Sequence, residues 1–382
     1  MIGIDISQIV YETGVSRYTK ELVRHLLRID QENEYLLFAG VWRQKEKIEA
    51  FFDELHQQGL NFQSQVVLLP PKLADLVFNQ WRVPVEWFTG RIDVFHASNW
   101  TTPKTSAKLV TTIHDLTPIL FPETFPPNLI KSFQRNLQLI EKTAVAVLVD
   151  CETIKKDLLQ HTEIPVGKIY PVYLAAGHQF QPVKDKVKIA KVKQKYGIVG
   201  DYILSVATQE PRKNIKRLIE AFSQLNLNDI SLVLVGKYGW GEKTKLKINP
   251  PAGGEKLKII ETGFVDDQDL PVLYSGARVF VYPSLYEGFG LPVLEAMQCG
   301  CPVIISNRSA TAEISGEAAL LIDPTGTSTL TQAIKQILAD KKLREEMVRK
   351  GIKRAGQFNW RKTALETLAI YRKVIDASGY PS

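Results

Sequence analysis

Two glutamates, Glu287 and Glu295, bracket a glycine-containing loop in the sequence YEGFGLPVLEA, with seven residues between them. A strand-like run precedes the loop, and Pro292 stands where a first helical residue is favoured. The first backbone N–H groups of such a helix have no partner within it and can bind a phosphate or sugar hydroxyls. A loop that a ligand can approach closely, with a carboxylate on each side, suits a sugar nucleotide better than a bare phosphate.

Two carboxylates at this spacing could also be the acid and base of a glycosidase. We expect Glu287 on the loop and Glu295 almost one turn inside the following helix, so their roles should differ. Glu287 is then expected near the sugar or the β-phosphate, and Glu295 near the ribose hydroxyls. A structural role for Glu295, as a cap or an ion-pair partner within the fold, remains the alternative.

A pair of cations, Arg212 and Lys213, stands between a strand-like run and a helix-like run, with Asn214 as a suitable N-cap. At a helix N-terminus, the dipole and the side-chain charges both favour an anion. A diphosphate leaving group needs such neutralisation. The alternative is a solvated basic pair beside a helix start.

Two further residues are weaker candidates. His114 follows an apolar strand-like run, where it could hydrogen-bond a sugar hydroxyl or a phosphate, although a histidine that holds the turn would look the same. Gly14 follows the first expected strand, and its missing Cβ lets backbone N–H groups approach a phosphate. Ordinary turns between strands and helices also use glycine.

The composition is that of a globular protein of about two domains: 382 residues, 45% hydrophobic and 23% charged. The net charge is +7, but Lys and Arg are spread along the chain without interleaved stacking aromatics, which argues against nucleic acid. Three cysteines cannot build a disulfide scaffold, and no apolar run reaches the length of a membrane span. We therefore expect a cytoplasmic protein.

The acidic run Asp266, Asp267 and Asp269 has a spacing that could suggest a divalent metal. It also opens a helix-like segment, where acidic residues cap the helix and favour its dipole. Capping is the stronger interpretation, so we predict no metal.

The segment 129–142 places Lys131, Arg135 and Lys142 among apolar residues at helical spacing. An ordinary amphipathic surface helix explains this pattern. Contact with an anionic membrane surface, or with the phosphate of a lipid acceptor, is the alternative and would make the protein peripheral at the inner face of the membrane.

Strand-like and helix-like segments alternate along the chain, which predicts an α/β fold with doubly wound sheets. We expect strands at 2–6, 35–39, 65–69, 94–96, 109–113, 145–149, 202–207, 231–235, 257–262, 279–282 and 302–306. The stretch 170–182 lacks periodicity and contains two prolines and a glycine, so we place the domain junction there.

The expected domains are 1–174 and 175–358, followed by a C-terminal segment, 359–382, whose amphipathic helix should pack back on the first domain. Two such domains would face each other across a cleft at the carboxyl ends of their strands, where α/β proteins bind ligands.

Together these motifs closely resemble glycosyltransferase family 4, which contains retaining, group 1 glycosyltransferases of the GT-B fold with mannosyltransferase-like members. The resemblance covers almost the whole chain, and the loop with its two glutamates is its most specific part. The matching segments are TGVSRY (13–18), TIHDL (112–116), EPRKN (210–214), TGFV (262–265), YPSLYEGFGLPVLEA (282–296) and FNW (358–360).

The resemblance implies that the second domain binds a nucleotide-diphosphate sugar, such as a GDP- or UDP-sugar, as donor substrate, with no cofactor or metal. Arg212 and Lys213 would hold the diphosphate, Glu295 the ribose, and Glu287 the sugar or its phosphate. The remaining implied contacts are the backbone of Phe289, Gly290 and Leu291 to the sugar or its phosphate, the backbone near Val265 to the base, His114 to the sugar, and Gly14 leaving room for the phosphate. Some family members carry a further phosphate-binding arginine where this chain has Ala207.

The implied reaction moves a hexose, by resemblance mannose, to a glycan or a lipid-linked saccharide in cell-surface polysaccharide synthesis. No side chain stands out as a nucleophile, which agrees with transfer assisted by the leaving diphosphate. The first domain would bind the acceptor. A nucleotide-sugar epimerase on the same scaffold and a non-catalytic nucleotide-sugar-binding subunit are the alternatives.

Overall fold

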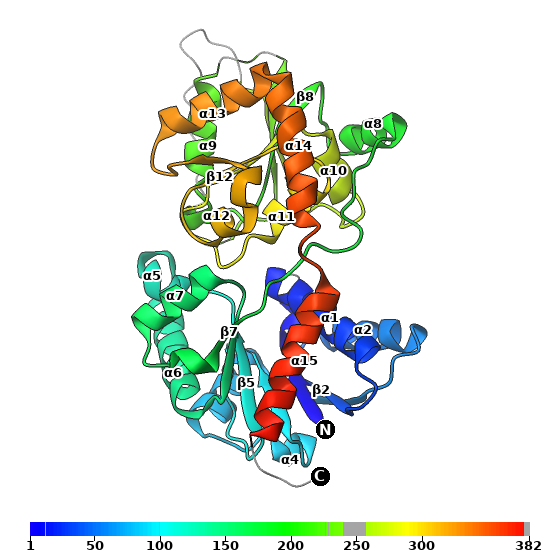
Figure 1. Ribbon diagram of the computed structural model, residues 1–382, viewed down its shortest axis with the longest axis vertical. Helices are drawn as coiled ribbons and strands as arrows, with labels where there is room; N and C mark the ends of the chain where they lie inside the picture. Colours follow the sequence, from blue (N-terminus) through cyan, green and yellow to red (C-terminus); the bar gives the residue numbers. More distant parts are fainter. Residues whose placement is uncertain (12, 99, 226, 228, 240–256, 378–382) are drawn as a thin grey trace. The chain divides into compact units, whose positions relative to one another are not determined.

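The computed structural model describes residues 1–377 except 12, 99, 226, 228 and 240–256. The chain divides into two compact units, Met1–Leu174 with Asn359–Ser382, and Ala175–Phe358. The last five residues of the expected C-terminal segment lie outside the described part. Each unit is built on one parallel sheet (Figure 1).

The first unit contains a seven-stranded sheet in the order β3-β2-β1-β4-β5-β6-β7. The strands in the middle of this sheet are buried and almost entirely apolar, as expected when helices cover both faces of the sheet. The strand order reverses between β1 and β4, which is the switch point where such sheets bind ligands. The strands are β1 (Ile2–Asp5), β2 (Tyr35–Val41), β3 (Gln63–Leu68), β4 (Val94–Ala97), β5 (Lys108–Ile113), β6 (Ala146–Val149) and β7 (Ile169–Pro171).

The longer helices of this unit each bury one apolar stripe, and four aromatic rings pack together on one side of the sheet: Phe38, Phe78, Phe88 and Phe95. The α-helices are α1 (Gly14–Ile29), α2 (Lys45–Gln57), α3 (Pro71–Ala74), α4 (Glu86–Thr89), α5 (Thr117–Leu120), α6 (Pro127–Thr143), α7 (Glu152–His161) and α15 (Trp360–Asp376). A π-helical turn, η2 (Asp75–Gln80), precedes α4, and short 3₁₀ turns are η1 (Ser7–Tyr11), η3 (Pro122–Thr124) and η4 (Val166–Lys168).

The C-terminal helix α15 belongs to the first unit although it follows the second in sequence. It lies alongside α1, as the red and blue ribbons of Figure 1 show. The hydroxyl of Thr363 donates to the carbonyl of Tyr173 at 2.6 Å, and Trp360 and Tyr371 are buried. The amphipathic pattern of this helix is therefore accounted for by packing on the first unit.

The second unit contains a six-stranded sheet in the order β10-β9-β8-β11-β12-β13, with its switch point between β8 and β11. The strands are β8 (Asp201–Val206), β9 (Ile230–Val235), β10 (Ile259–Gly263), β11 (Val279–Tyr282), β12 (Val303–Ser306) and β13 (Leu320–Ile322). The helices are α8 (Lys186–Lys195), α9 (Ile215–Ser223), α10 (Leu270–Gly276), α11 (Leu291–Gln298), α12 (Ala310–Ser315), α13 (Thr327–Ala339) and α14 (Lys341–Ala355), with 3₁₀ turns η5 (Pro211–Lys213) and η6 (Gly316–Ala318).

The predicted α/β class with two doubly wound sheets is confirmed, and every expected strand is present within two residues at each end. Sequence analysis missed β7 and β13, the last strand of each sheet. Both have only three residues, and in each only one of the three is buried. Such short edge strands carry neither a continuous apolar run nor an alternating pattern.

Asn214 and Asp269 occupy the N-cap positions of α9 and α10, but neither makes the capping hydrogen bond expected of its side chain. Asn214 does not cap α9 through its side chain, because it adopts a left-handed conformation (φ 59°) and its amide donates to the carbonyls of Pro283 and Pro324. Asp269 makes no capping hydrogen bond at the start of α10. Instead, Asp266 and Asp269 both lie 2.6 Å from the ammonium group of Lys195.

Candidate active site

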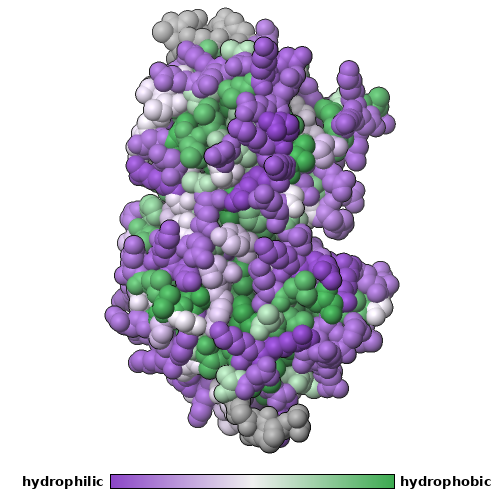
Figure 2. All heavy atoms as spheres, viewed as in Figure 1, coloured by the Kyte–Doolittle hydropathy of each residue, from purple (hydrophilic) through white to green (hydrophobic). Residues whose placement is uncertain are grey.

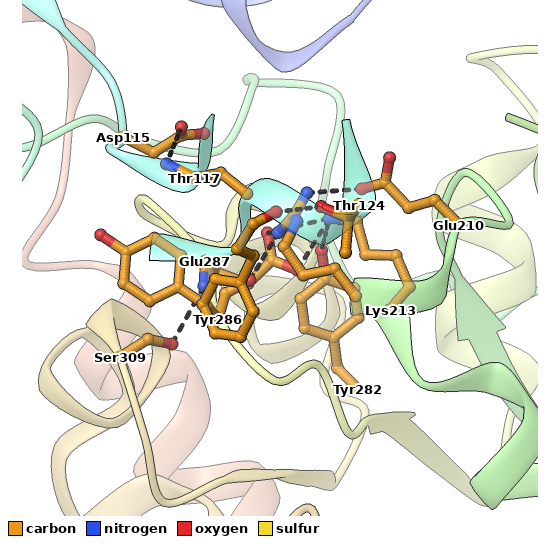
Figure 3. A network of polar contacts seen from close by, with 11 residues as sticks. Asp115, Thr117, Thr124, Glu210, Lys213, Tyr282, Tyr286, Glu287 and Ser309 are labelled. Carbon is orange, nitrogen blue, oxygen red and sulfur yellow. Dashed lines mark hydrogen bonds and ion pairs between the residues drawn. The ribbon is translucent and has the colours of Figure 1, made fainter. Parts of the chain in front are cut away.

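Three of the predicted site residues form one buried cluster in the second unit. Lys213 Nζ lies 2.7 Å and 2.8 Å from the two carboxylate oxygens of Glu287, and a guanidinium nitrogen of Arg212 lies 3.2 Å from the same carboxylate. Lys213 also donates to the hydroxyl of Tyr282 at 2.9 Å. These side chains converge because η5 follows β8 and the Glu287 loop follows β11, the two strands at the switch point (Figure 3).

The charges in this cluster control one another. Burial alone would raise the pKa of Glu287, but Lys213 and Arg212 outweigh it and hold that pKa at about 2. Burial lowers the pKa of Lys213, and the neighbouring Arg212 cation lowers it further, against the attraction of Glu287. Burial also raises the pKa of Tyr282 well above its ordinary value, so its hydroxyl stays protonated. The site therefore holds an ionised carboxylate beside two cations.

Arg212 has a second carboxylate partner, Glu210, which sequence reasoning missed as a site residue. The distance from a guanidinium nitrogen of Arg212 to Glu210 Oε1 is 2.5 Å. Glu210 belongs to the same EPRKN segment, but an acidic residue beside two cations gives no signal of which cation it binds. Two carboxylates and two cations make the cluster neutral, so an incoming diphosphate would have to compete with Glu287 or Glu210.

The loop that carries Glu287 is fixed by backbone contacts. The backbone N–H of Leu285 donates to the carbonyl of Arg212 at 2.9 Å, and the guanidinium of Arg212 donates to the carbonyl of Tyr286. The backbone N–H of Glu287 donates to the hydroxyl of Ser309 at 3.1 Å (Figure 3). These bonds hold the Arg212 turn and the glutamate loop in one arrangement.

Gly290 is required where the loop enters α11. Its φ is +96°, a conformation that residues with a Cβ rarely adopt, and an added Cβ would lie 2.7 Å from Thr311 Cγ2. Pro292 occupies the first turn of α11, as predicted. Phe289 and Leu291 are buried, and the contacts of their backbone with the donor stay a prediction.

Glu295 lies inside α11 and is 1% exposed. The hydroxyl of Tyr274, on α10, donates to its Oε2 at 3.1 Å. Glu295 therefore has a hydrogen-bond partner within the second unit, and its contact with the ribose stays a prediction. Val265 follows β10 and is also buried.

The two remaining predicted residues, His114 and Gly14, belong to the first unit. His114 directly follows β5, and its Nδ1 lies 2.9 Å from a carboxylate oxygen of Asp150, which directly follows β6. Burial would lower the pKa of His114, but the Asp150 carboxylate outweighs this effect and raises it. Gly14 is exposed and is the first residue of α1.

Sequence reasoning missed Asp150. The only signal that could have found it is its position: Asp150 directly follows β6, His114 directly follows β5, and these two strands are neighbours in the sheet.

Within the described residues, no group of three or more His, Cys, Asp or Glu side chains is arranged to hold a metal ion. The acidic run at 266–269 instead binds Lys195 through Asp266 and Asp269, as described above.

Comparison with known proteins decides the family. A model of "Glycosyl transferases group 1" matches residues 189–354, and a model of "Glycosyltransferase Family 4" matches residues 13–175. The chain is 30% identical to O-antigen chain mannosyltransferase B of Escherichia coli over 375 residues, which cover 94% of this chain and 96% of that protein. The chain is a group 1 glycosyltransferase. Both the predicted family and the predicted enzyme class are confirmed.

Two further proteins are similar to this glycosyltransferase, one over part of its sequence and one in its fold. Serotype-specific mannosyltransferase WbdA of E. coli is 30% identical over 278 residues, 71% of this chain but 34% of that protein. Among solved structures, Anabaena HepE in complex with UDP and glucose has a TM-score of 0.73 at 17% identity, covering 98% of this chain and 100% of that one. At this identity the structural match shows the fold, which is of the GT-B type with two Rossmann-like domains.

Proposed function

We propose that this glycosyltransferase moves a hexose, with mannose as the first choice, from a nucleotide-diphosphate sugar to a glycan or lipid-linked saccharide in cell-surface polysaccharide synthesis. The choice of mannose and of the acceptor class is supported by the relatives named O-antigen chain mannosyltransferase B and WbdA. The observation that carries the proposal is the buried cluster of Arg212, Lys213 and Glu287 at the switch point of the second sheet.

In the proposed reaction, Arg212 and Lys213 bind the diphosphate and stabilise the negative charge that develops on it as the bond to the sugar breaks. Glu287, released from the cations, accepts hydrogen bonds from the sugar hydroxyls. The leaving diphosphate assists attack by the acceptor hydroxyl on the same face of the sugar, so the anomeric configuration is retained. We propose that the donor is a GDP- or UDP-sugar and that no metal or cofactor takes part.

A panel of GDP-, UDP- and ADP-sugars tests the donor. A ligand that binds the folded protein raises its melting temperature, so the true donor should stabilise the protein more than the other sugar nucleotides. The stabilising donor is then incubated with and without saccharide acceptors, and the products are separated. Transfer requires a new glycoside and a free nucleoside diphosphate. An altered nucleotide sugar formed without acceptor would instead identify an epimerase and overturn the proposal.

We also propose a cytoplasmic location with peripheral contact to the inner face of the membrane. Helix α6 buries its apolar stripe at Phe133, Leu137 and Ile140, so these residues are not free to insert into lipid. Its Lys131 and Lys142 are exposed, while Arg135 contacts Asp75 at 3.4 Å. The support for membrane contact is therefore electrostatic, and it agrees with a lipid-linked acceptor.

No helix that the structure describes is both long and apolar enough to span a membrane. On the face drawn in Figure 2, hydrophobic residues form separate patches divided by hydrophilic ones. Co-sedimentation with vesicles tests the contact: binding to anionic vesicles should fall with added salt and with Lys131→Ala/Lys142→Ala, and equal recovery with anionic and neutral vesicles would refute it.

A further inference from the structure

His114 is held on two sides within the first unit. Its Nδ1 lies 2.9 Å and 3.1 Å from the two carboxylate oxygens of Asp150, which is 3% exposed. The ring of Tyr18, on α1, meets the imidazole edge-on, with a centroid distance of 4.7 Å and an interplanar angle of 76°. Two contacts from different elements fix the orientation of the imidazole, not only its position.

The side chain of Tyr18 is itself held by hydrogen bonds in the core of the first unit. Tyr18 shares a hydrogen bond of 2.8 Å with the hydroxyl of Thr112, which in turn lies 2.8 Å from His96 Nε2. His96 Nδ1 lies 2.5 Å from the hydroxyl of Tyr371 on α15. A chain of buried polar contacts therefore runs from the C-terminal helix to the ring that packs against His114, and it resists displacement of that ring.

The contact with Asp150 decides which nitrogen of His114 is left for a ligand. A carboxylate can only accept, so Nδ1 must carry a proton in both the neutral and the charged imidazole. Nε2 is then an acceptor in the neutral ring and a donor in the imidazolium. Among the described residues, no hydrogen bond to His114 Nε2 is formed. His114 lines a small cavity of about 20 Å³ together with Asp5, Gln8 and Ser98, at the carboxyl ends of β1, β4 and β5.

We propose that Asp150 is a positioning residue for His114, which fixes the imidazole so that Nε2 is the atom presented to the substrate of the transfer. This inference rests on the proposed function, which gives His114 a sugar hydroxyl or a phosphate oxygen to bind. Asp150 touches no reacting atom and acts only through His114.

The groups that face His114 favour the charged imidazole. Burial lowers the pKa of His114, but Asp150 and Asp115 outweigh it and raise that pKa, and the neighbouring Tyr18 ring is uncharged. His96, on β4, stays neutral, because burial and the proximity of His114 lower its pKa to about 3. The imidazolium can donate from Nε2 to a phosphate or hydroxyl oxygen.

The first test observes the imidazole directly by NMR in the whole 382-residue chain. Histidine labelled with ¹⁵N should show His114 as the Nδ1–H tautomer when neutral. Asp150→Asn should lower the His114 pKa by about one unit or more, a tenfold loss of proton affinity. Asp115→Asn is the matched control, since it removes a neighbouring carboxylate that makes no hydrogen bond to His114, and it should cause a smaller shift. An unchanged His114 pKa and tautomer in Asp150→Asn would overturn the pairing.

The second test separates positioning from structure. Asp150→Asn should lower kcat/KM by about 10- to 100-fold in the parent protein, as expected for a lost charge-assisted hydrogen bond. In a His114→Gln background the same substitution should cost nothing further, because Asp150 acts through His114. Additive losses would overturn the proposal. If the parent protein transfers no sugar from any donor, the proposed reaction fails, and the NMR titration still decides the pairing by itself.

Discussion

Lys213 Nζ lies 2.7 Å from Glu287 Oε1, so two side chains that the sequence assigns to different parts of one donor form a buried ion pair. The pair has a consequence for binding. A diphosphate needs the cation, and a sugar hydroxyl needs the carboxylate. If the donor binds as proposed, it separates the pair and gives each member a new partner, so that little uncompensated charge is left buried.

Replacement of Glu287 by Gln should therefore move two quantities in opposite directions. Affinity for a nucleoside diphosphate should rise by about tenfold, because the carboxylate no longer competes for Lys213 and Arg212. The rate of transfer should fall by about 100-fold or more, because the sugar loses a charged acceptor. Isothermal titration with GDP and UDP measures the first effect, and initial rates measure the second.

Glu261→Gln is a suitable control for this experiment, since Glu261 is an exposed carboxylate of β10 in the same unit. It should leave both quantities near their parent values. Weaker binding of the nucleoside diphosphate to Glu287→Gln would contradict the competition between Glu287 and the diphosphate.

The same carboxylate should make the stability of the protein depend on acid. The pKa of Glu287 is held at about 2, below its ordinary value of 4.5, so its contribution is fully present above pH 4.5 and is lost as the pH falls towards 2. The shift corresponds to a contribution on the order of 3 kcal/mol to the free energy of unfolding. Urea midpoints measured between pH 7 and pH 3 should decline less steeply in Glu287→Gln than in the parent protein. Parallel curves for the two proteins would show that Glu287 titrates normally.

The sequence predicted the two doubly wound sheets, because strand patterns depend on local information. That the Arg212 turn and the Glu287 loop bind the same donor was implied only by the resemblance to glycosyltransferase family 4. The sequence could not predict that Lys213 pairs with Glu287 or that Tyr274 donates to Glu295. These contacts join residues far apart in the chain, and their partners are set by side-chain packing. Asp150 was missed for the same reason, since nothing in a sequence distinguishes a carboxylate that faces a histidine from one that faces water.

Removal of the Lys213 charge tests the diphosphate contact itself. Lys213→Met keeps much of the length of the side chain but not its charge, and it should weaken nucleoside diphosphate binding by about 10- to 100-fold. Binding by the parent protein should weaken with added salt more than binding by this variant. Lys195→Met is the matched control, because Lys195 pairs with Asp266 and Asp269 at the surface of the same unit. Equal affinities of the parent protein and Lys213→Met would remove Lys213 from the diphosphate site.

Asn214 connects the turn that carries Arg212 and Lys213 to the rest of the second unit. Substitutions of Asn214 can measure how much this connection contributes to stability. Its side-chain amide donates to the carbonyl of Pro283 at 3.1 Å and to that of Pro324 at 2.7 Å, and its φ is 59°. Asn214→Asp keeps the shape and the tolerance of a left-handed backbone, but it places a carboxylate against two carbonyl oxygens. We expect this variant to lose about 3 kcal/mol of unfolding free energy. If the Asn214 side chain instead capped α9 as an acceptor, Asn214→Asp should leave the unfolding free energy unchanged, since Asp caps as well as Asn.

Asn214→Gly and Asn214→Ala separate the contribution of the two hydrogen bonds from that of the left-handed backbone. Glycine removes the two hydrogen bonds but adopts the left-handed backbone without strain, so it should cost about 2 kcal/mol. Alanine removes the same bonds and adds about 1 kcal/mol of backbone strain, so it should be the less stable of the two. Urea unfolding of the three variants gives the ranking. A glycine variant within a few tenths of a kcal/mol of the parent protein would mean that the bonds to Pro283 and Pro324 do not hold the turn that carries Arg212 and Lys213.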